Sequence, residues 1–181
     1  MRKQLLVLPA LLVTTVAALS AQPAEAQSVT FTLTGGSLAI AEPGSPAALT
    51  GGALSGLTGS SVTGALGSTV VTDQRGALVG WSSKIAGGSG GFTNGTTTIP
   101  ATSAVAWVPG LVSTTGVVVA TQGTYLTQLT GLALTTSAQS LVTATGVVGN
   151  NSATFTPSIA VSIPSNATAG DYTGVVTQTV G

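Results

Sequence analysis

Hydrophobic and polar residues alternate along much of this chain with the two-residue period of a half-buried β-strand. The clearest case covers residues 154–163, where every second position is apolar: Phe155, Pro157, Ile159, Val161 and Ile163. The positions between them carry Thr, Ser or Ala. Proline has no backbone N–H to donate to a neighbouring strand, so Pro157 places this strand at a sheet edge or at a bend.

Similar patterns predict further strands. Residues 172–180 form the expected last strand, with Tyr172, Val176 and Gln178 on one face together with Gly174 and Val180. Residues 28–33 alternate in the same way. Less regular strands are expected at residues 103–108, 116–121, 125–134 and 140–145.

A polar turn joins two further β-rich runs, residues 69–73 and 78–85. The turn reads Asp73-Gln74-Arg75-Gly76, and a polar turn that ends in glycine between two such runs predicts a β-hairpin. We expect Asp73 to bond backbone amides of the turn and to pair with Arg75. Alternatively, Arg75 donates to a buried backbone carbonyl and acts as a structural pin.

The Gly, Ser and Thr residues of segment 49–68 are typical of a linker, but Leu54, Leu57, Val62 and Leu66 recur within it. We therefore expect a loosely ordered part of the domain. About eight to ten short strands then predict one all-β domain over residues 27–181, a β-sandwich of the immunoglobulin-like kind.

The first 26 residues are typical of a secretory signal peptide. Arg2 and Lys3 precede an apolar run over residues 5–19, and Ala24-Glu25-Ala26 offers a cleavage point. The run is shorter than the roughly 20 residues of a membrane span. We expect residues 27–181 to be exported, without a membrane span, to the outside of the cell or to its surface.

Charged residues make up only 4% of the sequence, which contains no His and no Cys. A typical domain is about 25% charged. Within residues 27–181 the charged residues are Arg75, Lys84, Glu42, Asp73 and Asp171. Because acid–base catalysis, metal binding and phosphate recognition all need such groups, we expect no enzyme, no metal site, no cofactor and no nucleic-acid partner.

Three groups of residues together resemble a known family. They are residues 71–76 (Val-Thr-Asp-Gln-Arg-Gly) followed by Gly80-Trp81; Phe92 followed by Ile99-Pro100; and Ile163-Pro164 followed by residues 169–174. This pattern resembles the WxL-type surface proteins of Gram-positive bacteria, especially their actinobacterial relatives, over about residues 70–181. The resemblance implies export, a β-rich domain and non-covalent attachment to the cell wall through peptidoglycan.

The chain departs from that family at both of its signatures. Trp81 is followed by Ser82-Ser83 where the family has Trp-x-Leu, and Gln178 occupies the position of the second Trp. The loss of the second Trp weakens the expectation of wall binding more than the expectation of the fold.

The residues best suited to contact a wall glycan are Trp81, Tyr172 and Gln178. An aromatic ring could stack on a sugar, and an amide could bond its hydroxyls. Each has a structural alternative: Trp81 packs in the core, Tyr172 fixes a corner, and Gln178 finds a partner inside the sheet.

The sequence therefore predicts a secreted, non-catalytic surface protein that associates with cell-wall glycan or with other surface proteins. A second hypothesis is a structural subunit of a pilus-like or coat-like assembly. Strand edges with so few charges have little to oppose pairing between copies.

Overall fold

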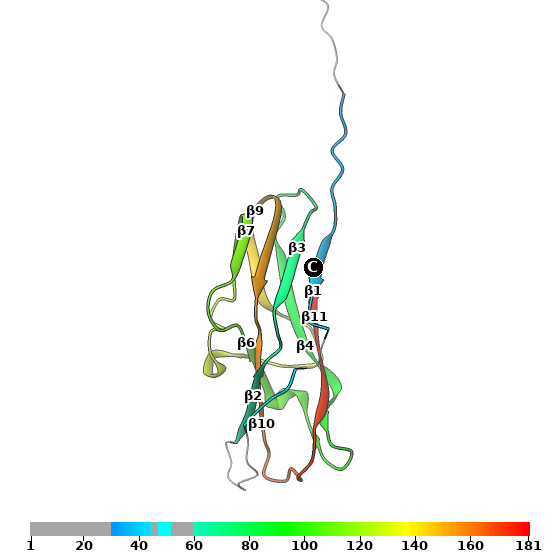
Figure 1. Ribbon diagram of the computed structural model, residues 1–181, viewed down its shortest axis with the longest axis vertical. Helices are drawn as coiled ribbons and strands as arrows, with labels where there is room; N and C mark the ends of the chain where they lie inside the picture. The colour runs from blue at the N-terminus through cyan, green and yellow to red at the C-terminus, as the bar shows by residue number, and fades with distance from the viewer. Residues whose placement is uncertain (1–29, 45–46, 52–59) are drawn as a thin grey trace, which may run out of the picture. The chain divides into compact units, whose positions relative to one another are not determined.

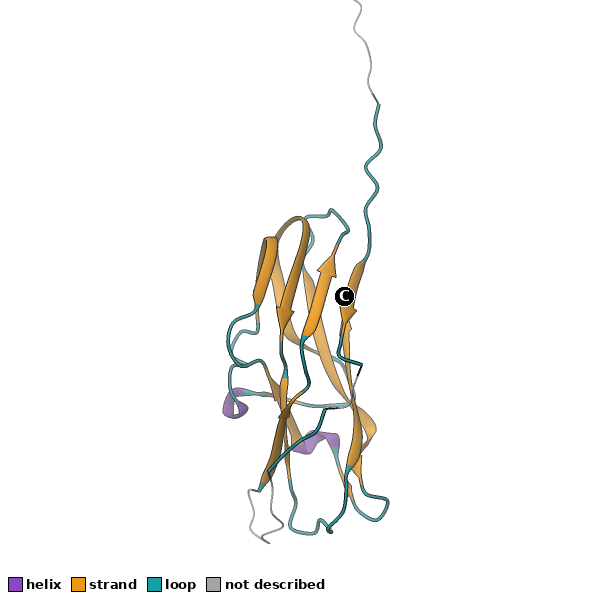
Figure 2. Ribbon diagram, viewed as in Figure 1, coloured by secondary structure: helices purple, strands orange, loops and turns teal. Residues whose placement is uncertain are grey.

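The computed structural model describes residues 30–44, 47–51 and 60–181, and it confirms an all-β fold of antiparallel sheets that pack as a sandwich or near-barrel (Figures 1 and 2). The predicted signal peptide lies outside these residues. The described strands are β1 (Leu38–Ala41), β2 (Ser61–Ala65), β3 (Thr69–Asp73), β4 (Trp81–Thr93), β5 (Thr98–Ile99), β6 (Ala104–Trp107), β7 (Ser113–Thr121), β8 (Leu132–Ala133), β9 (Gln139–Phe155), β10 (Ser158–Ser162) and β11 (Thr173–Val180). Two 3-10 turns, η1 (Ala101–Ser103) and η2 (Gln128–Thr130), complete the secondary structure; none of the described helices is long and apolar enough to cross a membrane.

The strands form two sheets. The seven-stranded sheet has the order β1-β3-β9-β4-β11, with β5 added beside β4 and β7 beside β9. The four-stranded sheet has the order β2-β10-β6-β8. Apolar side chains from both sheets form the core, among them Val71, Trp81, Ile85, Phe155 and Ile159.

The alternating run 154–163 crosses from one sheet to the other. β9 ends at Phe155, and β10 begins at Ser158 in the smaller sheet. Pro157 is buried at the crossing. It lies between the two strands, so its lack of an N–H removes no hydrogen bond from either ladder. The predicted bend is thus confirmed, whereas the predicted edge position is wrong, because β10 lies between β2 and β6.

A second segment crosses beside the first. β2 pairs with β10 and β3 pairs with β9, both antiparallel, and the Leu66 N–H donates to the Pro157 carbonyl between them at 2.8 Å. The part of segment 49–68 that is described therefore belongs to the domain, as expected. Residues 52–59 of that segment lie outside the described residues.

The predicted hairpin between residues 69–73 and 78–85 is wrong, although both strands exist. β3 and β4 each pair with β9 and not with each other. The turn residues serve instead to connect two strands that lie on different parts of β9.

β9 bends sharply in its middle, where Gly146 and Gly149 have φ of +60° and +68°. Trp81 lies opposite Ala144 in the ladder, yet its indole N–H donates to Asn151 Oδ1 at 3.1 Å. A straight strand would separate Ala144 from Asn151 by about 23 Å. β9 therefore arches over, and the arch is visible at its label in Figure 1.

The arch curls the larger sheet towards closure. One half of β9 pairs with β3 and the other with β4, and the outer strands β1 and β11 lie against each other. This arrangement is what makes the sandwich close to a barrel.

The predicted last strand is confirmed as β11, and the face shared by Val176, Gln178 and Val180 is the inward one, which decides between the two alternatives left for Gln178. Two other predicted strands are wrong. Residues 30–33 form no strand, and Phe31 and Leu33 are exposed. Residues 125–134 contain only η2 and the two-residue β8, because Thr127 caps a 3-10 turn there.

The start of β4 offers a steric test of this fold. A Cβ atom on Gly80 would collide with the Ala144 carbonyl oxygen of β9, whereas a Cβ on Gly90 would meet nothing within 4 Å. Gly80→Ala should lower the free energy of unfolding by about 1–3 kcal/mol through overpacking. Gly90→Ala should leave it unchanged or raise it slightly, and equal denaturation midpoints for the two variants would contradict the β4–β9 contact.

Candidate functional site

Trp81 is a core residue. Its side chain is 3% exposed, and its indole N–H is satisfied by the Asn151 side chain. The ring therefore offers no open face on which a sugar could stack.

Gln178 is also buried, at 8% exposure. Its Nε2 lies 3.2 Å and its Oε1 3.4 Å from Thr69 Oγ1, which is fully buried on β3. The amide thus bonds across the closing side of the larger sheet, between β11 and β3.

Tyr172 is half-buried just before β11. Its hydroxyl donates to the Thr168 carbonyl at 2.9 Å and accepts from the Thr168 N–H at 3.2 Å. This is the corner role named as the alternative for Tyr172, since both bonds hold the loop before the last strand in place.

The three residues do not converge on one surface. Tyr172 precedes the end of β11 that pairs with Thr93, whereas Trp81 lies beside the other end, where Gly181 and Ser82 exchange backbone bonds of 2.8 and 3.1 Å. The intervening strand is on the order of 25 Å long. The expected glycan contact by Trp81 and Gln178 is therefore corrected: both side chains complete the interior.

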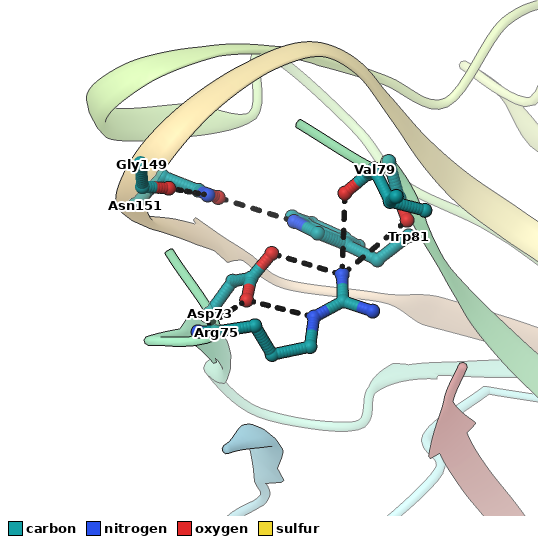
Figure 3. A network of polar contacts seen from close by, with 7 residues as sticks. Asp73, Arg75, Val79, Trp81, Gly149 and Asn151 are labelled. Carbon is teal, nitrogen blue, oxygen red and sulfur yellow. Dashed lines mark hydrogen bonds and ion pairs between the residues drawn. The ribbon is translucent and has the colours of Figure 1, made fainter. Parts of the chain in front are cut away.

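Asp73 and Arg75 form the most elaborate polar contact of the described chain (Figure 3). Arg75 donates from Nε to Asp73 Oδ1 and from Nη2 to Oδ2, both at 2.9 Å, and its backbone N–H donates to Oδ1 at 3.0 Å. The same Nη2 reaches the Val79 and Gly80 carbonyls at 3.3 and 3.4 Å. The ion pair considered for Arg75 is thus present. Its carbonyl contacts go to exposed Val79 and half-buried Gly80, so the alternative of a pin on a buried carbonyl is wrong.

Burial would normally oppose ionisation of Asp73, whose side chain is 1% exposed. The hydrogen bonds from Arg75 outweigh that effect and hold the pKa of the Asp73 carboxyl below its usual value. Reciprocally, the bond to Asp73 raises the pKa of Arg75. The carboxylate is therefore committed as a hydrogen-bond acceptor and is poorly suited to act as a general base.

Asn151 connects this pair to Trp81. It accepts from the Trp81 indole, donates to the Gly149 carbonyl at 3.1 Å and contributes a further hydrogen bond that lowers the pKa of Asp73. Gly76 ends the turn with φ of +65°, a value that favours glycine. The turn between β3 and β4 is thus fixed from both of its ends.

A cavity of about 300 Å³ lies between the inner side of β11 and the segment after β1. Its walls expose polar and apolar surface in about equal measure: Leu49, Phe92 and Ile159 are among the apolar residues, and Glu42 and Gln178 have polar side chains. Among the described residues, no three or more His, Cys, Asp or Glu side chains are grouped as metal ligands. The cavity presents one carboxyl group and no partner acid for two-carboxylate chemistry.

No family model, no curated protein and no solved structure matches this chain. The residues and geometry of the chain itself therefore carry the functional argument.

Pattern analysis missed three residues that organise the interior: Thr69, Asn151 and Gln122. Gln122 is buried and donates to the Gly110 carbonyl at 2.6 Å. Asn151 is 6% exposed and is the middle residue of an Asn-Asn-Ser sequence whose glycosylation acceptor position is the exposed Asn150. The available signal was compositional: in a chain with so few charges, amide side chains are the groups left to pair with buried backbone and hydroxyls.

The Thr69–Gln178 pair can be tested by a double-mutant cycle. Gln178→Leu should lower the free energy of unfolding by about 1–3 kcal/mol, because it strands the buried Thr69 hydroxyl. Adding Thr69→Val should recover much of that loss, since neither polar group then remains unpaired. Additive losses in urea denaturation would show that the two side chains do not interact.

The Asp73–Arg75 pair predicts a dependence of stability on pH. Because the folded-state pKa of Asp73 is lowered, its contribution is complete above the unfolded-state pKa, near 3.9, and is lost as the pH falls through the folded-state value. Asp73→Asn should lower the free energy of unfolding at pH 7 by about 1.5–3 kcal/mol and flatten the acid limb of the stability curve.

The matched control is Asp171→Asn, at an exposed carboxyl in the loop before β11. It should leave both the neutral-pH stability and the acid limb close to those of the parent chain. An acid limb that persists in Asp73→Asn would contradict the role assigned to this pair.

Proposed function

We propose that this chain is an exported, non-catalytic protein of the bacterial cell surface that works by association with other molecules. Export rests on the signal-like residues 1–26. The absence of His and Cys from the sequence, together with an Asp73 already bound by Arg75, supports a role without catalysis.

The observation that carries the mode of association is the open edge of β7. This strand pairs with β9 on one side, and no described strand pairs with its other side. It is exposed along most of its length and carries no charged residue. Such an edge presents unpaired N–H and C=O groups to another strand, which supports a structural subunit that assembles by strand pairing.

Wall association remains a second candidate, supported by one further observation. The residues that carry the resemblance to the WxL-type proteins, Asp73, Arg75 and Trp81, form one connected network. That network holds the turn whose exposed tip bears Leu78 and Val79, at 76% and 62% exposure. In this proposal the turn tip, rather than buried Trp81 or Gln178, contacts the wall.

The wall hypothesis is tested by sedimenting residues 27–181 with purified Gram-positive cell wall. Leu78→Ser should reduce the bound fraction severalfold, whereas Leu129→Ser, at an equally apolar and 98% exposed position on η2, should not. A parent chain that stays wholly in the supernatant, while a known wall-binding protein sediments, would remove this candidate.

The assembly hypothesis is tested by multi-angle light scattering of the same chain over a wide concentration range. We expect a mass above that of the monomer at high concentration, because the β7 edge is complementary to another strand. A strict monomer throughout would contradict assembly and leave wall association as the remaining proposal.

A further inference from the structure

β7 is a long edge in the part of the chain that the structure describes, because it pairs with β9 alone. β5 and β8 have only two residues each. The outer side of β2 is occupied by Thr50, whose N–H and C=O exchange bonds of 2.8 and 2.9 Å with Thr63. β11, the other long strand at an end of the larger sheet, pairs with β4 and lies against the short strand β1.

The usual protections of an edge strand are largely missing from β7. Protein edges are commonly blunted by charge, proline or a bulge. β7 has neither charge nor proline. Its ladder to β9 is irregular around Gly116, but both register shifts place the extra residues on β9. Residues 117–121 therefore remain as a run of typical strand length on the open side.

The side chains of this run leave apolar surface uncovered on both faces. Val118 and Ala120 pack on the core but are only half-buried. On the other face, Val117 and Val119 are 59% and 63% exposed, and Val148 of β9, opposite Val117, is 54% exposed. We call these last three residues the valine patch.

We propose that β7 pairs antiparallel with β7 of a second copy of this chain, around a two-fold axis near Val119. This inference rests on the proposed function and names the partner for its open edge. Self-pairing sets Val119 opposite Val119 and Val117 opposite Thr121 of the second copy. The two valine patches become continuous, and β-branched cross-strand pairs stabilise the contact without charge repulsion.

The number of open edges decides the form of the assembly. Because β1 lies against β11, the edge left open for a long contact is β7, and edge-to-edge contact uses it on both copies. A contact of this isologous kind closes on itself. The product is therefore a dimer with one sheet running through both copies, and not the growing filament of a pilus or coat.

The test compares charge variants on and off this edge by analytical ultracentrifugation of residues 27–181. The parent chain should reach a dimer mass and stay there as concentration rises. Val119→Lys should be monomeric, since two like charges meet across the axis, whereas Leu129→Lys on exposed η2 should still dimerise. Mixing Val119→Lys with Val119→Glu should restore the dimer, and a mixture that stays monomeric would overturn the proposal.

A cysteine provides a second readout, because the chain has none of its own. Val119→Cys should form a covalent dimer on mild oxidation, and Leu129→Cys should do so far more slowly; equal rates would count against the axis near Val119. Filaments that grow with concentration would contradict the dimer but agree with the proposed assembly by strand pairing. A monomer at every concentration would contradict both the dimer and the assembly proposal. Thermal unfolding monitored by circular dichroism checks that each variant is folded.

Discussion

The bend in β9 is the constraint on which the rest of this fold depends. One continuous strand hydrogen-bonds to β3, β4 and β7, and its arch at Gly146 and Gly149 brings together the half that pairs with β3 and the half that pairs with β4. The arch brings the two halves of the larger sheet round a common core and carries Asn151 to the Trp81 indole. Without it, β1 and β11 could not meet, and the Thr69–Gln178 bond could not form.

The interior is specified by neutral polar groups where many proteins use ions. Amides at Gln122, Asn151 and Gln178 each bond a backbone carbonyl or another side chain inside the sheets. The single ion pair among the described residues, Asp73–Arg75, secures a turn at the surface end of the core. Buried polar groups need partners with defined geometry, so these bonds select one register for the strands they join.

Local patterns predicted the all-β class, the last strand with its shared face and a bend at Pro157, because period-two alternation and proline chemistry act over a few residues. They failed where pairing is decided at long range. The turn around Arg75 has the residues of a hairpin turn. The two strands that flank it, β3 and β4, nevertheless each pair with β9 and not with each other. For the candidate site, spacing left glycan contact and a structural role both open for Trp81, Tyr172 and Gln178. It could not reveal their partners Asn151, Thr168 and Thr69, which only tertiary contact supplies.

The kind of bond that holds this interior together also decides how the stability of the fold responds to salt and to reductants. Dissolved salt screens attraction between exposed charges but has little hold on hydrogen bonds between uncharged groups within a sheet. The described structure has one ion pair that salt could screen, and the sequence has no cysteine, so there is no disulfide for a reductant to break. The stability of the protein should therefore change little with ionic strength or with added reductant.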